Sequence, residues 1–440
     1  MNILEKAEQM LRAHPLCDYC LGRQFALLGF GLENKSRGKA IKSLLTMEGH
    51  RLLHNEELAS SLLRVVAING SFDMARDILM HFSKFPQEKP ACFLCEGQVE
   101  NSAVIAYKAI EELKGLEFST FLVGVELPHR IAEREDEFKA RFNVTHGESM
   151  KSQFSRNIGK QIYEITGKEV DYRKPDLVVL ANPFTNFVQL QTNPVYVGGK
   201  YRKLVRGIPQ SRWVCGECNG KGCEICSWTG KRYSDSIEEL IGIPILKITK
   251  GEEMAFHGSG REDVDARMLG FGRPFVLEVK KPKTRFFDLK KLELTINDNA
   301  KGKIEVHDLY FANKNIIRRL KKAEANSKIY RMIVMFDQSI SDEELQKIER
   351  VLSDVTIRQQ TPQRVLHRRA DLRRDKYIYK TKVKRLSYNQ AELQIHCQGG
   401  LYIKELITGD KGRTNPSVAS ILRIKATPLQ LDVLEIISGE

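Results

Sequence analysis

Acidic and basic side chains alternate between glycines in residues 260–270. Asp263 and Asp265 stand there beside Arg261, and the flanks hold few apolar residues, which predicts a loop. An aspartate next to an arginine stays ionised even near a polyanion, and an ionised carboxylate needs no general base to act as a nucleophile. The stretch therefore indicates a carboxylate site. The alternative is a solvated turn before a strand at residues 275–279.

Cysteines form the second group of residues that could do chemistry. Eight of the nine stand in Cys-x-x-Cys pairs, namely Cys17/Cys20, Cys92/Cys95, Cys215/Cys218 and Cys223/Cys226. In a reducing compartment such pairs indicate metal binding before disulfides, and two pairs supply four sulfurs at about 2.3 Å from one tetrahedral zinc ion.

We expect one structural zinc at the first two cysteine pairs and a second at the last two, where Gly220 and Gly222 permit the tight turn that a short link needs. The alternatives are unrelated loops for the first set and a flexible or redox-labile linker for the second. Pairing between the two sets stays open.

Charge narrows the class of partner. The 440 residues carry a formal net charge of +14 with a pI of about 9.2, which favours nucleic acid or an anionic surface over a basic protein without such a partner. No segment resembles a signal peptide, and no apolar run approaches the roughly 18 residues of a membrane span. We therefore expect a cytoplasmic protein that does not contact a membrane.

Helices and strands must hold these groups in place, and the hydrophobic spacing predicts both. Helical spacing covers residues 3–14, 39–53 and 56–82, around the first two cysteine pairs. Strand and helix patterns then alternate as in an α/β domain, at residues 119–126, 131–142, 148–166, 176–180 and 186–190.

The C-terminal half adds further strands. Ser236 and Glu239 form a capping-box signal for a helix that runs to residue 248. Later strands are expected at residues 275–280, 329–336, 377–386, 393–397 and 431–437, with a helix at 342–352. Because these elements follow no strict βαβ rhythm, the expected class is α+β with several domains.

A resemblance gives the acidic stretch a more specific meaning. Residues 260–275, Gly-Arg-Glu-Asp-x-Asp-x-Arg-x-Leu-Gly-x-Gly-Arg-Pro-Phe, resemble the active-site signature of the tRNA pseudouridine synthase family numbered ten. By this resemblance Asp263 is the catalytic carboxylate, Asp265 is a nearby alternative of lower rank, and Arg261 contacts the substrate.

Other residues match the family's site motifs, and their roles are implied by the resemblance alone. Lys404 is expected to pair with Asp263, and Ile403 to pack on the active base. Tyr330 corresponds to the tyrosine that stacks on the target base and is a candidate to take a proton, while Leu431 matches an aliphatic wall. Without the resemblance Lys404 is a surface lysine, and Tyr330 and Leu431 are core residues.

Residues 361–374 are the densest cationic segment of the chain. Guanidinium groups bind phosphates through paired hydrogen bonds and can fill the gap left by a flipped nucleotide. The segment resembles the family's thumb loop, and a solvated basic turn is the alternative. The best matches are Arg364, His367, Arg368 and Arg369.

Residues 200–213 place cations beside aromatic rings, an arrangement suited to unpaired RNA bases and their phosphates. The alternative is a solvated edge with one buried tryptophan. Residues 121–210 resemble the THUMP-type RNA-binding domain of the same synthases, which holds the 3′ end of tRNA. The cations expected to contact RNA are Arg202, Lys203 and Arg206.

The expected organisation has four parts: a helical zinc module at 1–100, a THUMP-type domain at 101–213, a cysteine-rich linker at 214–232 and a pseudouridine synthase domain at 233–440. The resemblance implies a tRNA pseudouridine synthase that isomerises uridine 54, uridine 55 or both in the TΨC arm, without an organic cofactor or an obligate protein partner. The alternative function is that of a non-catalytic tRNA-binding factor.

Overall fold

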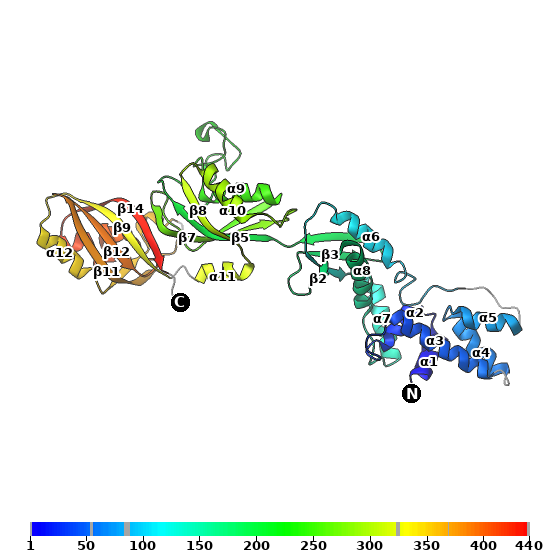
Figure 1. Cartoon of the computed structure of the whole chain (residues 1–440). Helices are drawn as coiled ribbons and strands as arrows, with labels where there is room; N and C mark the ends of the chain where they lie inside the picture. Colours follow the sequence, from blue (N-terminus) through cyan, green and yellow to red (C-terminus); the bar gives the residue numbers. More distant parts are fainter. Residues whose placement is uncertain (1, 53–55, 83–88, 323–325, 368, 438–440) are drawn as a thin grey trace. The chain divides into compact units, whose positions relative to one another are not determined.

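The chain forms two compact units, Met1–Asn193 and Pro194–Glu440 (Figure 1). The computed structural model describes residues 2–52, 56–82, 89–322, 326–367 and 369–437. None of the helices in these ranges combines the length and the apolar character that a membrane crossing requires. Each unit has its own hydrophobic core, and each is described by itself below.

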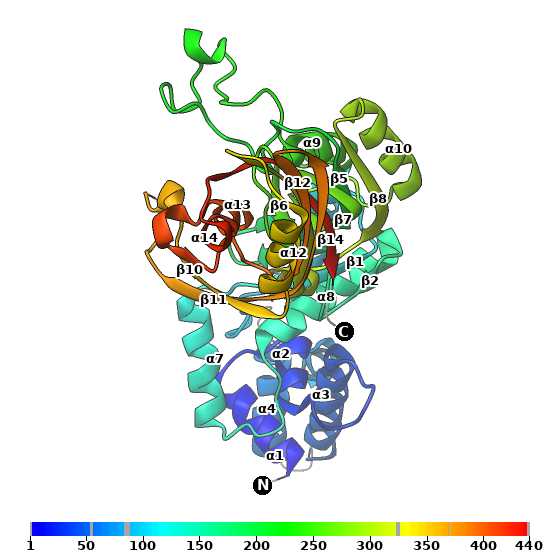
Figure 2. The same cartoon turned by 90° about the vertical axis from the view of Figure 1, so that its left-hand side faces the viewer.

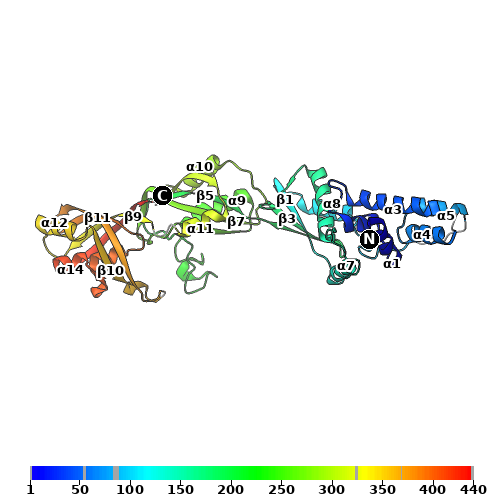
Figure 3. The same ribbon diagram turned by 90° about the horizontal axis from the view of Figure 1, so that it is seen from below.

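The first unit begins with short helices that pack on one another, with α3 and α4 side by side in Figure 3. They are α1 (Ile3–Ala13), α2 (Asp18–Gly22), α3 (Asn34–Arg51), α4 (Glu56–Ile68) and α5 (Asp73–Phe82). The prediction of a single helix at residues 56–82 is wrong, because the helix is interrupted between α4 and α5. A side chain at Gly70 would bring its Cβ within 2.2 Å of the Val66 carbonyl oxygen, and Ser71 has a φ of +48°.

The rest of the first unit is an α/β layer. Its four-stranded sheet has the order β2-β1-β3-β4. The elements are α6 (Ser102–Leu113), β1 (Thr120–Val125), α7 (His129–Arg141), α8 (Met150–Thr166), β2 (Glu169–Val170), β3 (Leu177–Asn182) and β4 (Phe187–Thr192). One core cluster runs from Ala7 to Ala181, so the helical module and the α/β layer share a core instead of dividing at residue 100.

The second unit is built on a ten-stranded sheet of order β13-β10-β11-β12-β9-β14-β7-β5-β8, with β6 paired to β7. β14 and β7 run parallel, whereas the other described neighbours are antiparallel. The strands are β5 (Val195–Lys203), β6 (Glu253–Gly258), β7 (Arg267–Lys280), β8 (Ile304–Phe311), β9 (Ser327–Phe336), β10 (Val355–Gln360), β11 (Arg373–Ser387), β12 (Gln390–Cys397), β13 (Thr414–Asn415) and β14 (Ala426–Ile437).

Helices cover both faces of this sheet near β7 (Figure 1). Phe275 and Leu277 pack with α9 (Ile237–Thr249) and α10 (Leu289–Ala300), while Val276 packs with α11 (Lys314–Lys322) on the other face. Around β9 to β12 the core is closed by the helices that Figure 2 shows together, namely α12 (Asp342–Val351), α13 (Ile403–Thr408) and α14 (Val418–Leu422). The α+β class is confirmed.

Residues 194–213 do not belong with the RNA-binding domain in which we expected them. β5 pairs with β7 and β8 in the sheet of the second unit. Val195, Val197 and Tyr201 alternate along this strand and are buried, a pattern typical of a core strand. Of the cations that suggested an RNA-binding edge, Arg202 and Lys203 are part of this strand and Arg206 follows it. The boundary between the two units falls between residues 193 and 194.

The parallel join between β7 and β14 depends on Gly270. Its φ is +57°, and a Cβ there would lie 1.9 Å from the Leu434 carbonyl oxygen. Gly302 is a matched control, because its φ is +73° but no heavy atom lies within 4 Å of the Cβ position. A side chain in the left-handed region costs about 1 kcal/mol at either glycine.

We predict that Gly302→Ala lowers the melting temperature of the second unit by about 2–4 °C. Gly270→Ala should lower it by more than about 6 °C, because the clash with β14 adds to the backbone cost. Tryptophan fluorescence reports on this unit, since both tryptophans of the chain lie in it. Equal shifts for the two variants would contradict the close contact at Gly270.

Candidate active site

A cavity of about 470 Å³ opens in the second unit beside the acidic loop. Its volume falls within the range of pockets that hold small ligands. The walls come from residues 260–266, from β9 and β14, from α13 and from the cationic segment after β10. Eight candidate site residues from the sequence meet here: Arg261, Asp263, Tyr330, Arg364, Arg369, Ile403, Lys404 and Leu431.

The Asp263 carboxylate lies between two cations. Its Oδ2 is 3.2 Å from Lys404 Nζ and 3.3 Å from Arg364 Nη2. Arg364 is itself fixed by its Nε, which donates to the buried carboxylate of Glu405 at 2.7 Å. The pair that the resemblance implied, Asp263 with Lys404, is thus present.

Lys404 also bridges to Asp265, whose two carboxylate oxygens both lie 2.8 Å from Nζ. Partial burial raises the pKa of Asp265, but the Lys404 ammonium outweighs it and holds that pKa below its ordinary value. Asp263 lines the cavity and is 35% exposed, whereas Asp265 does not line it and is 67% exposed. Of the two aspartates, Asp263 is the one that faces the cavity.

Tyr330, Ile403 and Leu431 form the less polar walls. Ile403 and Leu431 are 4% and 9% exposed, so both are core residues with an edge on the cavity. Burial raises the pKa of the Tyr330 hydroxyl well above its ordinary value, and that group stays protonated at neutral pH. The cavity therefore combines a carboxylate with apolar surfaces and a neutral phenol.

Lys203 supports the acidic loop from beneath. It is fully buried, and its Nζ donates to the carbonyl oxygens of Asp263 at 3.2 Å and Val264 at 2.8 Å. Burial lowers the pKa of Lys203 to about 8. We expected this lysine to contact RNA, but an ammonium sealed under the loop does not reach a phosphate.

Arg206 and Arg202 also differ from the expectation. Arg206 Nη1 donates to the carbonyl oxygens of Asp265 at 2.9 Å and Leu431 at 2.5 Å, so it ties the loop to β14. Arg202 pairs with Glu305 on β8 and does not line the cavity. Both side chains hold the fold of the second unit.

A buried network beside Asp263 was not foreseen from the sequence. Glu262 accepts hydrogen bonds from the Tyr201 hydroxyl at 3.0 Å and pairs with Arg273 Nε at 2.8 Å. Both charged side chains are 1% exposed. Glu262 also borders the cavity, but its carboxylate is bound by Tyr201 and Arg273, whereas that of Asp263 contacts Lys404 and Arg364. The acid-rich pattern carries no signal for which carboxylate is buried.

Only some of the cations expected to contact RNA line the cavity. Arg369 lines the cavity and donates from Nη1 to the Tyr402 hydroxyl at 3.0 Å. His367 is exposed and does not line the cavity, and Arg368 lies outside the described residues. Arg261 lines it as well, with its guanidinium carbon 5.3 Å from the ring centre of Trp213.

Two sets of four cysteines come together, one in each unit: Cys17, Cys20, Cys92 and Cys95, and Cys215, Cys218, Cys223 and Cys226. Within each set all sulfurs lie within 4.8 Å of one another. The sets are therefore self-contained, which answers the question of pairing between them. In the second set Gly220 and Gly222 have φ values of +88° and +95°, as the short link required.

The sulfur spacing fits a tetrahedral metal site. Metal–sulfur bonds of about 2.3 Å place tetrahedral sulfurs about 3.8 Å apart. The distance from Cys17 Sγ to Cys95 Sγ is 3.7 Å, and that from Cys218 Sγ to Cys226 Sγ is 3.8 Å. Backbone N–H groups also point at the sulfurs, as Gly222 N does at Cys218 Sγ at 3.2 Å. Both sets could hold a metal ion.

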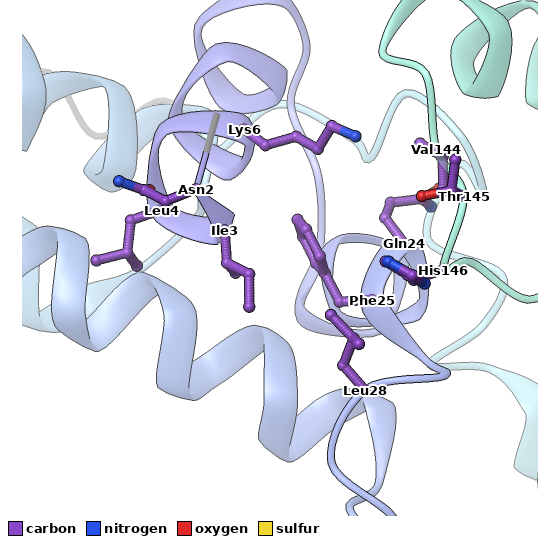
Figure 4. Close-up of a pocket in the computed structure, with 10 residues that line it drawn as sticks. All are labelled: Asn2, Ile3, Leu4, Lys6, Gln24, Phe25, Leu28, Val144, Thr145 and His146. Carbon is purple, nitrogen blue, oxygen red and sulfur yellow. The ribbon is translucent and has the colours of Figure 1, made fainter.

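A second cavity, of about 620 Å³, lies in the first unit (Figure 4). Figure 4 shows it between α1, Phe25 and the segment around His146. None of its ten lining residues carries a carboxylate, and the Lys6 ammonium donates to the Asn143 carbonyl oxygen at 2.6 Å. It lacks the charge arrangement of the cavity at Asp263, which is the candidate active site.

Two family models match successive parts of the chain. The one described as Pus10 THUMP domain, archaeal, covers residues 105–182, and the one described as Pus10, C-terminal, covers residues 196–437. Together with the fold, they define a THUMP-bearing protein whose candidate site lies in a Pus10-type C-terminal domain.

Relatives that match nearly the whole chain identify the family. The chain is 40% identical over 438 residues to the tRNA pseudouridine synthase Pus10 of Methanothrix thermoacetophila, with 99% of this chain and 94% of that protein covered. It is 44% identical over 440 residues to that of Methanocaldococcus jannaschii, with 97% and 93% covered. The chain belongs to the Pus10 family of tRNA pseudouridine synthases.

Solved structures add little to this assignment. A Cbf5-Nop10-Gar1 complex matches 54% of this chain and 48% of that chain, at 12% identity and a TM-score of 0.30. A TM-score this low supports no statement about the site.

Asp432 on β14, close to the candidate site, makes the stability of the second unit depend on pH. Its carboxylate is 3% exposed and pairs with Arg206, Arg267 and Arg331 at 2.6, 2.9 and 2.6 Å. Burial raises its pKa, but the hydrogen bonds from Arg267 and Arg331 outweigh this and lower it to about 2. A depressed carboxyl pKa stabilises the fold above the ordinary value of about 3.9, and that stability is lost as the pH falls toward the folded value.

We predict that Asp432→Asn lowers the free energy of unfolding of the second unit by roughly 2–3 kcal/mol at pH 7. The difference from the wild type should shrink as the pH falls from about 4 to about 2, since a protonated Asp432 resembles asparagine. Urea unfolding followed by tryptophan fluorescence at several pH values measures this. A difference that stays constant down to pH 2.5 would contradict the role of the Asp432 charge.

Proposed function

We propose that this chain isomerises uridine 54, uridine 55 or both in the TΨC arm of tRNA, with Asp263 as the nucleophile. The observation that carries the proposal is the Asp263 carboxylate, which faces the cavity and lies 3.2 Å from Lys404 Nζ and 3.3 Å from Arg364 Nη2. Two cations at this distance attract the carboxylate and fix its orientation. Membership of the Pus10 family supports the substrate class.

The reaction breaks the bond from N1 of uracil to C1′ of the ribose, turns the base, and joins C5 to C1′. Overall, C5 loses a proton and N1 gains one, so the product is an isomer of the substrate. Asp263 attacks as an ionised carboxylate and needs no activating base. The uridine must first leave its stack, and the cavity of about 470 Å³ receives it.

The apolar walls hold the extruded base. Ile403 and Leu431 contact its faces or edges, and Tyr330 stacks on it. Because Tyr330 stays protonated, its hydroxyl serves as a hydrogen-bond donor and as a partner in proton exchange during turnover. Lys404 and Arg364 remain with the carboxylate and stabilise its charge when the glycosyl bond re-forms.

Cations around the cavity mouth bind the RNA backbone. Arg261 and Arg369 line it, and guanidinium groups bind phosphates through paired hydrogen bonds. The THUMP match at residues 105–182 supports contact with the 3′ end of tRNA. Each cysteine set holds a structural zinc ion, since four thiolates at tetrahedral spacing are the ligands that zinc prefers. The chemistry at Asp263 uses no organic cofactor.

The alternative function is that of a tRNA-binding factor without activity. The THUMP match and the cationic rim would serve a binder equally well. Asp263 is the feature that separates the two functions, because a carboxylate repels phosphate and a protein that only binds tRNA has no need of one in this cavity.

We predict that Asp263→Asn lowers the single-turnover rate of pseudouridine formation at least about 1,000-fold while tRNA affinity changes less than about 3-fold. The matched control is Asp265→Asn, which loses a carboxylate from the same loop and the same Lys404 contact. Its rate should fall less than about 30-fold. The assay is carbodiimide detection of pseudouridine in the TΨC arm of a tRNA transcript.

Three results would decide against the proposal. Equal product from wild type and Asp263→Asn would remove Asp263 as nucleophile. A larger loss in Asp265→Asn than in Asp263→Asn would transfer the role to Asp265. Tight tRNA binding by the wild type without any product would favour the binding factor.

We also predict a steep salt dependence of tRNA binding. Neutralised phosphates release counterions, so the logarithm of the affinity should fall with the logarithm of salt concentration with a slope steeper than about −2. Asp263→Asn should show the same slope as the wild type, because Asp263 contacts no phosphate. Fluorescence anisotropy of labelled tRNA measures both slopes, and a flat response would contradict a cationic RNA surface.

A further inference from the structure

Trp213 stands at the cavity without a role in the proposed reaction. It is half-buried and lines the same cavity as Asp263. Arg261 and Arg232 place their guanidinium carbons 5.3 and 5.6 Å from its ring centre, and the Tyr233 ring meets it edge-on at 5.6 Å. An indole among cationic planar groups is the surface on which unpaired nucleobases stack.

The second cysteine set begins two residues after Trp213, and backbone hydrogen bonds link the two. The residues that lead into and out of the cysteine set pair with each other, and Val214 and Lys231 form a β-bridge there. We call this paired segment the neck. Next to this bridge Arg232 N donates to the Trp213 carbonyl oxygen at 3.0 Å, and Cys215 N donates to the Gly230 carbonyl oxygen at 2.9 Å. The cysteine set and the tryptophan are therefore joined through one short ladder of hydrogen bonds.

Arg261 connects the same tryptophan to the acidic loop. It stands two residues before Asp263, and its guanidinium lies over the indole. Stacking on a tryptophan fixes a long side chain that would otherwise move freely in solvent. A continuous set of contacts thus runs from the four cysteines through the neck and Trp213 to the loop that carries the carboxylate.

We propose that Trp213 and Arg261 form a second stacking subsite, which takes one unpaired RNA base other than the target uridine, and that the metal-bound cysteine set positions it. The subsite rests on the proposed function of the cavity, because a flipped uridine leaves neighbouring bases partly unstacked at its rim. Chemically it selects a planar base together with its phosphate. It needs no base-specific hydrogen bond and tolerates different bases.

Fluorescence tests the stacking directly. Trp213 and Trp228 are the only tryptophans of the sequence, so Trp228→Phe leaves Trp213 as the sole indole emitter. In the Asp263→Asn background, which blocks turnover, saturation with a tRNA transcript should quench Trp213 strongly. The control Trp213→Phe leaves Trp228, which is 73% exposed, and should be quenched much less. Unchanged Trp213 emission with tRNA bound, or equal quenching of the two emitters, would overturn the subsite.

Affinity measures the contribution of the ring. Trp213→Ala should raise the Kd for the tRNA transcript roughly 5- to 150-fold. Trp213→Phe keeps an aromatic face, so its Kd should stay within about 3-fold of that of the wild type. Equal losses in both variants would overturn the stacking role. A failed Asp263→Asn assay would remove the nucleophile but leave these binding results intact, so the two proposals can be told apart.

The positioning by the cysteine set is tested by a double-mutant cycle. Cys226→Ser should weaken tRNA binding to the same degree as Trp213→Ala, and the combined variant should show no further loss, since both act through one contact. Circular dichroism controls for the fold of the second unit. Additive losses, or full tRNA affinity in folded Cys226→Ser, would overturn the coupling.

Discussion

The ammonium group of Lys404 lies between two carboxylates of one loop, and the candidate site depends on it. Asp263 and Asp265 would repel each other without a shared cation, and both contact Lys404 Nζ at 3.2 and 2.8 Å. Arg364 adds a second positive charge on the cavity side of Asp263. Both cations come from segments far away along the sequence. The charge balance of the site therefore exists only in the folded second unit.

The sheet explains how such distant segments meet. The acidic loop leads directly into β7, and β7 runs parallel to β14, which brings Leu431 to the same cavity. β9, on the other side of β14, contributes Tyr330. β5 supports the loop through the buried Lys203. A parallel pair inside an otherwise antiparallel sheet thus brings a loop and four strands, β5, β7, β9 and β14, to one place.

Much of this arrangement could be predicted from the sequence, and the failures have physical causes. Hydrophobic spacing and caps gave most helices and strands, including α9 with its Ser236 cap. The resemblance gave the pairing of Asp263 with Lys404. Lys203 was misassigned because the sequence does not distinguish a lysine in solvent from a buried lysine. Its ammonium group donates to backbone carbonyl oxygens inside the protein. The buried Glu262 was missed for the same reason, since burial is set by the partner Arg273 and not by the local pattern.

Three acidic residues stand within four positions of the loop, and each meets a different environment. The side chain of Glu262 is 1% exposed, that of Asp263 is 35% exposed, and that of Asp265 is 67% exposed. The spacing of the loop is consequently under tighter constraint than its composition. Deleting or inserting one residue would leave all three acidic residues in the sequence. It would nevertheless move Glu262 away from Arg273 and Asp263 away from its position at the cavity. Length variation among natural relatives should accordingly be rarer in this loop than exchange between aspartate and glutamate at its exposed end.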